Sequence, residues 1–236
     1  MDLQEKTALI TGGSRGIGYA VAERFLREGA NVVITARNTD GLEKAAEQLH
    51  QIPAGAITTV PGDVSHEYHV DKWIDTTLKE YGSIDVLVNN AGISRNAEVH
   101  RLSSEDFKAV QDTNLFGTFL MCHKVLPTMK NQQRGFIFNM ASFAGTKGLP
   151  RSGAYGSSKA GVIRLSETLQ RELKEDNIKV TAICPGYVYT EMTESTGVPQ
   201  TEMIQPEDIP ETMMYVMRLS GASLVQRIVI ERFGSI

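Results

Sequence analysis

A tyrosine and a lysine four residues apart form the pair in this sequence best suited to proton transfer. Tyr155 and Lys159 lie in Ser152-Gly-Ala-Tyr-Gly-Ser-Ser-Lys159, which reads as the start of a helix. Residues four apart lie on one helical face, one turn from each other. An ammonium beside a phenol favours the phenolate and lowers a pKa that is ordinarily about 10. Such a tyrosine can give or take a proton at a carbonyl or hydroxyl group, although surface pairs on amphipathic helices have the same spacing.

A glycine-rich segment, Thr11-Gly-Gly-Ser-Arg-Gly-Ile-Gly18, follows the first apolar run of the chain. Gly12, Gly16 and Gly18 are spaced as G-x-x-x-G-x-G, which differs from the G-x-G-x-x-G dinucleotide fingerprint. Glycines let backbone N–H groups reach a pyrophosphate, and the helix that follows presents its N-terminus to the anion. The position between a strand and a helix favours nucleotide binding over a simple tight turn, and the absence of GK[ST] argues against a P-loop hydrolase.

The residues after the second strand indicate which nicotinamide coenzyme binds. NAD enzymes usually have an acid there that binds the ribose 2′-hydroxyl. Here Ala36 is followed by Arg37, and the first acid, Asp40, fits the start of a helix. Arg15 of the glycine loop can reach the same region, and two guanidinium groups suit a 2′-phosphate because Arg pairs with phosphate bidentately. We therefore predict NADP rather than NAD.

Short β-branched segments alternate with helical patterns along the whole chain. The expected strands are residues 7–11, 31–36, 57–60, 85–89, 136–140, 179–184 and 227–231. The expected helices are residues 19–28, 40–50, 65–81 (with Ser65 as N-cap), 104–131, 152–173 and 206–219. The alternation predicts an α/β fold, a Rossmann-type doubly wound sheet of about seven parallel strands with helices on both faces, as one domain over residues 1–236. Ligands of such sheets bind beyond the carboxyl ends of the strands.

The composition narrows the possible function classes. The 236 residues have a formal net charge of −4, which provides neither a nucleic-acid footprint nor a polybasic membrane patch. Cys122 and Cys184 match no metal spacing and fit a reducing compartment, and the five histidines do not cluster with acids or cysteines. Charged residues near the start argue against a signal peptide, and no apolar run approaches the roughly 18 residues of a membrane span. We expect a soluble cytoplasmic protein without a metal.

Several segments resemble, in their order and separations, the short-chain dehydrogenase/reductase family. They are Thr11–Gly18, Asn89-Asn-Ala-Gly92, Ser142, Tyr155-x-x-x-Lys159 and Pro185-Gly186. Within the family, the glycine loop and the segment Val-Asn-Asn-Ala-Gly-Ile are typical of the 3-oxoacyl-[acyl carrier protein] reductase group, and many relatives of other specificity share them. The resemblance covers nearly the whole chain.

The resemblance implies a role for each of four polar side chains. Tyr155 would be the general acid in carbonyl reduction and the base in the reverse direction, and Lys159 would lower its pKa and hold the nicotinamide ribose. Ser142 would hydrogen-bond the substrate oxygen, so that Ser142 and Tyr155 stabilise the charge that develops there. Asn114 would hold a water that links Lys159 to solvent. Ser142 as a turn serine and Asn114 as a mid-helix residue bonded to its own backbone are the purely structural alternatives.

The same resemblance implies a coenzyme site in the loops that follow the strands. Asp63 and Val64 would contact the adenine, the segment from Asn90 to Gly92 would line the cleft, and Pro185, Gly186 and Thr190 would lie at the nicotinamide end. The complete set of expected coenzyme contacts is Gly12, Ser14, Arg15, Gly16, Ile17, Gly18, Arg37, Asp63, Val64, Asn90, Ala91, Gly92, Tyr155, Lys159, Pro185, Gly186, Val188 and Thr190.

We therefore predict an NADP-dependent oxidoreductase that reduces a carbonyl to a hydroxyl by hydride transfer, with a 3-oxoacyl thioester as substrate. The alternatives are a reductase or dehydrogenase of another ketone, sugar or alcohol, and a non-catalytic NADP-binding regulator. The chain departs from the reductase group in ending on Ile228-Val-Ile-Glu-Arg-Phe-Gly-Ser-Ile236 instead of a strand followed by Asp-Gly-Gly. The substrate-covering segment, residues 191–205, is short and predicts an open or modest pocket. The resemblance also implies a homo-oligomer, a dimer or tetramer, formed through the helices of Leu115 and Tyr155.

Overall fold

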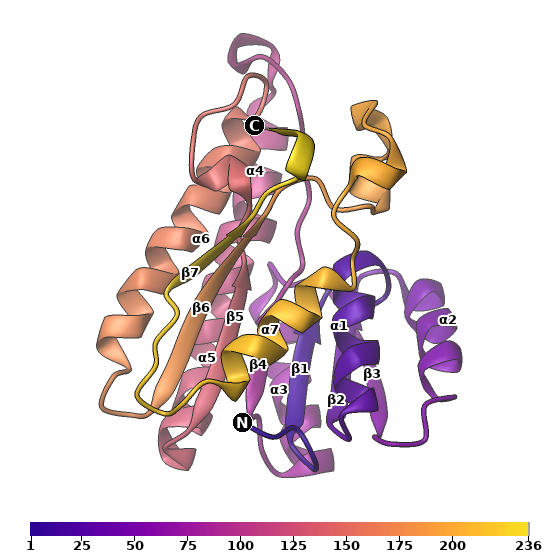
Figure 1. Cartoon of the computed structure of the whole chain (residues 1–236), viewed down its shortest axis with the longest axis vertical. Coiled ribbons are helices and arrows are strands. Elements are labelled where there is room, and N and C mark those ends of the chain that lie inside the picture. The colour runs from indigo at the N-terminus through magenta and orange to yellow at the C-terminus, as the bar shows by residue number, and fades with distance from the viewer. Residues whose placement is uncertain (236) are drawn as a thin grey trace.

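The computed structural model describes residues 1–235, which form one seven-stranded sheet flanked by helices (Figure 1). The strands are β1 (Thr7–Thr11), β2 (Asn31–Ala36), β3 (Ile57–Pro61), β4 (Val86–Asn89), β5 (Gly135–Met140), β6 (Ile178–Pro185) and β7 (Arg227–Ile230). Their order in the sheet is β3-β2-β1-β4-β5-β6-β7, and every neighbouring pair is parallel. The predicted Rossmann-type doubly wound fold is confirmed.

Helices cover both faces of the sheet. They are α1 (Gly16–Arg27), α2 (Thr39–Leu49), α3 (Glu67–Tyr81), α4 (Ser104–Gln111), α5 (Gly117–Gln132), α6 (Gly153–Glu172) and α7 (Asp208–Arg218). Apolar side chains of α1, α2 and α7 form one buried cluster with the sheet, and those of α3, α5 and α6 form another. The two clusters lie on opposite faces because the side chains of a strand alternate between its faces.

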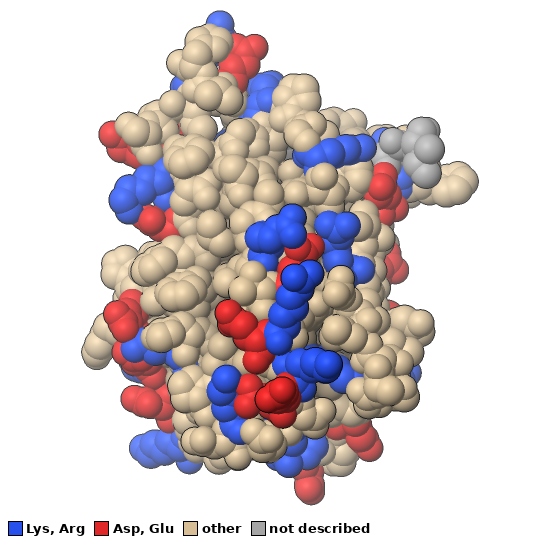
Figure 2. Space-filling view, turned by 90° about the vertical axis from the view of Figure 1, so that its left-hand side faces the viewer, with Lys and Arg blue, Asp and Glu red and all other residues tan. Residues whose placement is uncertain are grey.

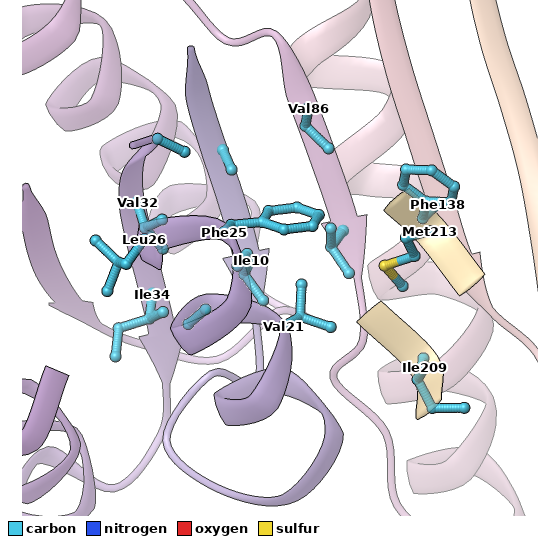
Figure 3. Close-up of a cluster of buried hydrophobic side chains, with 14 of the residues drawn as sticks. Ile10, Val21, Phe25, Leu26, Val32, Ile34, Val86, Phe138, Ile209 and Met213 are labelled. Atoms are coloured by element: carbon cyan, nitrogen blue, oxygen red, sulfur yellow. The ribbon is translucent and has the colours of Figure 1, made fainter. Parts of the chain in front are cut away.

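β1 shows how the central strands hold the two layers together. All five of its side chains are buried, as expected for a central parallel strand. Ile10 packs in the cluster that contains Val21 and Phe25 of α1 (Figure 3). Its neighbour Leu9 packs in the other cluster with Trp73 of α3. The short β-branched segment therefore anchors a helical layer on each face, and its carboxyl end is held in a fixed position.

The helix predicted over residues 104–131 contains a local widening. α4 and α5 are joined by a π-helical turn, Asp112–Phe116, which adds one residue to the turn. Asn114 lies in this turn and is fully buried. The widening changes the direction of the side chains around it, and turns of this kind are frequent at functional sites.

Two expected helix starts differ in the structure. Ser65 does not cap the third helix, so that prediction is wrong: α3 begins at Glu67, and no side chain caps it. The Ser65 amide and hydroxyl instead both donate to the Asp63 carboxylate, at 2.9 and 2.7 Å. At α2 the cap is Asn38, whose side chain accepts from the Gly41 amide at 2.9 Å. At α2 a side-chain acceptor thus satisfies a free helix amide, whereas Ser65 bonds to Asp63 and leaves α3 without a side-chain cap.

A chain of buried amide and hydroxyl groups joins β4, β5 and α6. Asn89 Nδ2 donates to Asn139 Oδ1 at 2.8 Å, and Asn139 Nδ2 donates to the Ser166 hydroxyl at 2.9 Å. Ser166 in turn donates to the Val162 carbonyl of its own helix at 2.7 Å. Buried polar groups are costly unless they are paired, so this chain of hydrogen bonds favours one position of α6 on the sheet.

The charged side chains show no large area of a single sign on the side of the molecule where α6 lies. Acidic and basic residues are interspersed there, with broad uncharged areas beside them (Figure 2). Within residues 1–235, no helix has the length and apolarity needed to cross a membrane. The same residues contain no group of three or more His, Cys, Asp or Glu side chains placed to hold a metal ion.

Candidate active site

The glycine loop lies between the end of β1 and the start of α1. Gly12 has φ +66° and Gly16 has φ +54°, a region that favours glycine. A Cβ atom on Gly18 would lie 2.2 Å from the Gly12 carbonyl oxygen, so no larger residue fits there. α1 has no side-chain cap and no acidic residue in its first turn. Its free amide groups, together with the helix dipole, fit the pyrophosphate of a dinucleotide.

Hydrogen bonds fasten the loop after β4 to the glycine loop. Asn90 Nδ2 donates to the carbonyl oxygens of Thr11 and Gly12, each at 3.0 Å. The Thr11 hydroxyl accepts from the amides of Asn90 and Ala91, also at 3.0 Å. The side chain of Asn90, which was predicted to line the coenzyme cleft, therefore joins the two loops. Thr11 was not among the predicted site residues. The signal for its role was a hydroxyl at the last position of β1, directly before the glycines.

Asn114 joins the loop after β4 to α6 and is not a helix residue bonded to its own turn. Its Oδ1 accepts from the Ile93 amide at 2.8 Å, and its Nδ2 donates to the Ile93 carbonyl at 2.9 Å. The same Nδ2 also donates to the Ser158 hydroxyl at 3.0 Å. Ser158 is fully buried and was not predicted, although it directly precedes Lys159. The π-helical turn thus connects the loop after β4 to α6.

Lys159 is buried, with 4% of its surface exposed. Its Nζ donates to the Met140 carbonyl at the end of β5, at 2.6 Å. A Cβ atom on Gly92 would lie 3.5 Å from this nitrogen and 3.3 Å from Asn114 Oδ1, so the three residues meet at one point. Burial lowers the pKa of Lys159 to about 8, because the charged ammonium loses its hydration.

Ser142 and Tyr155 interact with each other beside this lysine. Ser142 is buried, donates to the Pro185 carbonyl at 3.4 Å and accepts from the Ala144 amide at 3.2 Å. It is therefore also the turn serine considered as an alternative. Burial raises the pKa of Tyr155, and a hydrogen bond with Ser142 acts in the opposite direction. The expectation that Lys159 lowers the pKa of Tyr155 is not met. The Lys159 Nζ lies 5.7 Å from the centre of the phenol ring and donates to the Met140 carbonyl instead.

The two predicted phosphate-binding arginines both lie beside carboxylates. Arg15 forms an ion pair with Glu191, and Arg37 Nη1 lies 3.8 Å from Asp63 Oδ2. Burial alone would raise the pKa of Asp63, but the hydrogen bonds from Ser65 and the charge of Arg37 outweigh it, and the net pKa is lowered. Residues 11 and 35 are paired in the parallel ladder, so the loops carrying these arginines leave the sheet at one edge.

The other predicted coenzyme contacts divide into two groups. Gly186 and Thr190 lie in the loop after β6, and the Thr190 methyl would be 3.0 Å from a Cβ atom on Gly16. The strand-end loops therefore meet at the glycine loop. Four predicted residues instead place their side chains in or against the apolar clusters; they are Ile17, Val64, Ala91 and Val188.

Similarity to known sequence families identifies the family to which this chain belongs. The family described as short chain dehydrogenase matches residues 6–200, which include all four predicted catalytic side chains. The chain belongs to the short-chain dehydrogenase family. It is therefore an oxidoreductase of a family that binds nicotinamide coenzymes.

Curated members of the family extend the similarity over nearly the whole chain. The 3-oxoacyl-[acyl-carrier-protein] reductase FabG of Chlamydia trachomatis serovar D is 37% identical over 224 residues, which are 91% of this chain and 90% of that protein. The protein of the same name from Thermotoga maritima is 36% identical, with 92% of each chain covered. An uncharacterized oxidoreductase of Staphylococcus saprophyticus is 34% identical and covers 92% of this chain and 93% of its own length.

Solved structures of the family have the same fold. Levodione reductase superposes with a TM-score of 0.90 at 27% identity, over 97% of this chain and 96% of that chain. The alcohol dehydrogenase from the archaeon Thermococcus sibiricus, complexed with 5-hydroxy-NADP, also gives a TM-score of 0.90, at 28% identity and 98% coverage of both chains.

The lowered pKa of Lys159 predicts how the stability of this family member depends on pH. In the unfolded chain the lysine keeps its proton up to about pH 10.4, whereas in the folded protein it loses it near pH 8. Between these values the unfolded state binds more protons, so stability rises with pH there and falls as the pH drops through 8. Relative to Lys159→Met, the wild type should gain on the order of 3 kcal/mol in free energy of unfolding between pH 8 and 10.4.

Urea unfolding across this pH range measures the effect, and Lys174→Met, at an exposed lysine just beyond α6, is the control. Only the difference between wild type and variant is compared, since groups remote from Lys159 titrate equally in both; the exception is the Cys184 thiol, whose pKa the Lys159 charge lowers. Parallel stability curves for the wild type and Lys159→Met would contradict the shifted pKa.

Proposed function

We propose that the protein is a single-domain NADP(H)-dependent reductase that converts a carbonyl to a hydroxyl, with a 3-oxoacyl thioester as its substrate. The observation that carries the proposal is the convergence of Ser142, Tyr155 and Lys159 at the ends of β5 and β6, where the loop of Asn90 and Gly92 connects them to the glycine loop before α1. The substrate class is supported by the 3-oxoacyl reductases at 36–37% identity. The names of the structural neighbours, levodione reductase and alcohol dehydrogenase, keep other carbonyls among the alternatives.

Each side chain of the site has a chemical task in this reaction. NADPH, when bound, supplies the hydride that adds to the carbonyl carbon. The hydroxyls of Ser142 and Tyr155 donate to the carbonyl oxygen, on which negative charge develops. Tyr155 then gives its proton to that oxygen, and its raised pKa ensures that the proton is present at neutral pH. Lys159, still mostly charged at pH 7, would hold the nicotinamide ribose hydroxyls.

The side of the site toward solvent suits a substrate with an apolar part. Tyr187, Tyr189 and Met192 follow β6 and keep 45%, 39% and 48% of their surface exposed. Val188 between the tyrosines is buried in the core, so the tyrosines lie on the opposite face of this extended segment. Exposed apolar side chains next to Pro185 and Gly186 provide a surface on which an acyl chain can pack.

Replacement of Tyr155 by Phe removes the proton donor and keeps the ring. We expect carbonyl reduction to fall by about a hundredfold or more, while NADPH still binds. Nicotinamide absorbance reports the rate with a panel of 3-oxoacyl thioesters, diketones and sugars, and Tyr215→Phe, on the exposed face of α7, is the matched control.

Three results would change the assignment. Retention of the full rate in Tyr155→Phe would contradict the proposed mechanism. Reduction of only a diketone or sugar would replace the thioester as substrate. Tight binding of NADPH with no reduction of any carbonyl would favour a coenzyme-binding regulator over an enzyme.

The preference for NADP is tested at Arg37, which follows β2 and faces solvent. Arg37→Asp should weaken NADPH binding by about tenfold or more, because a carboxylate repels the 2′-phosphate that the guanidinium would bind. NADH, which lacks this phosphate, should bind about as before. Lys44→Asp on α2 makes the same change of charge at a neighbouring exposed position. Equal affinity of the wild type for NADPH and NADH would contradict the coenzyme assignment.

We also propose a homo-oligomer formed through α5 and α6. A hollow of about 390 Å³ on this side has an almost wholly apolar lining, which includes Leu115, Phe116, Phe119 and Leu165. The rings of Phe116 and Phe119 stack at 6.1 Å, and more than two fifths of each residue is exposed. Contiguous apolar surface of this kind marks an interaction site, and a second copy of the chain would cover it.

Phe119→Glu should therefore convert the oligomer into monomers, because the carboxylate would be buried without a partner. Light scattering coupled to gel filtration measures the mass, and Tyr68→Glu on α3 introduces the same charge at another exposed aromatic residue. A monomeric wild type, or an oligomer that survives Phe119→Glu, would contradict the proposed interface.

A cytoplasmic location is proposed with this function. Cys122 and Cys184 are both free and buried thiols. Unpaired cysteines are the usual state in a reducing compartment.

A further inference from the structure

The segment that follows β6 is joined to the glycine loop by an ion pair. Glu191 begins the short 3₁₀ turn Glu191–Thr196, and its carboxylate contacts the guanidinium of Arg15. Arg15 is the residue directly before α1. The Thr190 methyl lies against Gly16 of the same loop. The substrate-side segment and the predicted phosphate-binding loop thus touch at two adjacent positions.

The ion pair gives Arg15 two anionic partners to choose between. One is the Glu191 carboxylate, and the other is the coenzyme phosphate that the sequence predicts for this arginine of the glycine loop. Carboxylates and phosphates both bind a guanidinium through the same fork of N–H donors. We propose that Glu191 sets the affinity of the coenzyme site, because its carboxylate competes with a coenzyme phosphate for Arg15. This inference rests on the proposed function.

The local structure keeps Glu191 in position for this competition. Thr190 and Thr193 form a capping box at the start of the turn. The Thr193 hydroxyl also donates to the Val188 carbonyl at 2.6 Å, which ties the turn to the end of the β6 segment. The carboxylate is therefore presented to Arg15 by an ordered backbone, and little conformational entropy is lost when the pair forms.

The far end of the segment is anchored independently of Arg15. Arg232 Nη1 donates to Glu202 Oε2 at 2.6 Å, and the Ile204 amide donates to the Tyr187 carbonyl at 3.0 Å. Loss of the Glu191 charge should therefore leave the segment in place. Arg37, the other predicted phosphate-binding arginine, is held differently from Arg15. Its partner Asp63 lies farther away and is fixed by hydrogen bonds from Ser65.

The magnitude of the competition follows from the exposure of the pair. The side chains of Arg15 and Glu191 are 70% and 58% exposed, so water and salt weaken their attraction. Exposed ion pairs change equilibrium constants by about twofold to fivefold. The effect on coenzyme affinity should have this size at low salt and should disappear at high salt.

The experiment measures the dissociation constants of NADPH and NADH by calorimetry at low ionic strength. Glu191→Gln should tighten NADPH binding by about twofold to fivefold. Glu194→Gln is the matched control, since Glu194 lies on the same turn, is exposed and has no ion pair among residues 1–235. In an Arg15→Gln background, Glu191→Gln should have no further effect.

The two coenzymes identify the phosphate. A gain limited to NADPH supports competition with the 2′-phosphate, and a gain shared with NADH supports competition with the pyrophosphate. Unchanged or weaker NADPH binding in Glu191→Gln, an equal gain in Glu194→Gln, or a gain that persists without Arg15 would each overturn the inference. If the wild type bound no NADPH at all, the proposed function itself would fail, which is a different result.

Discussion

Parallel pairing of the central strands brings the loops that follow them to one edge of the sheet. β1, β4, β5 and β6 are neighbours in space but come from four distant parts of the chain. Their carboxyl ends supply the glycine loop, the loop of Asn90, the Met140 carbonyl and the Pro185 carbonyl. Apart from the hydrogen bonds from Ser65 to Asp63, every hydrogen bond described for the site starts from or ends on one of these loops or on α6. The site therefore exists only while these strands keep their register.

Burial changes the pKa values of the two ionisable groups of the site. It raises the pKa of Tyr155 and lowers that of Lys159 to about 8, so both groups resist the charged form. A protonated phenol suits the reduction of a carbonyl, whereas the reverse oxidation needs the phenolate. The backbone carbonyl of Met140 and the amide of Asn114 help to fix the positions of these groups without adding a formal charge.

Opposite charges connect the site to more distant segments. Arg15 joins the glycine loop to the segment after β6, and Arg232 joins that segment to the residues after β7. Arg232, from the ending that departs from the Asp-Gly-Gly expected by resemblance, thus supports the segment after β6. Surface ion pairs are weak individually, so the partner of an exposed guanidinium such as that of Arg15 can be exchanged for another anion at little cost.

Much of the fold and part of the site could be predicted from local sequence. The alternation of β-branched runs with helical patterns predicted seven parallel strands, because strand and helix periodicities depend on near neighbours. The spacing of Tyr155 and Lys159 put them on one helical face, and the positions of Gly12, Gly16 and Gly18 indicated a close backbone approach. The order of these motifs was enough to indicate the family.

Only the tertiary structure decided the partners of these groups. Lys159 bonds to the carbonyl of Met140, and Arg15 pairs with a glutamate 176 positions away. Ser65 serves Asp63 instead of capping a helix, since the nearer carboxylate competes successfully for its hydroxyl. The pKa of Tyr155 moved opposite to the expectation because the loss of hydration outweighs the hydrogen bond with Ser142. Local sequence specifies which residues share an element and a face, whereas burial and long-range pairing depend on how the elements pack.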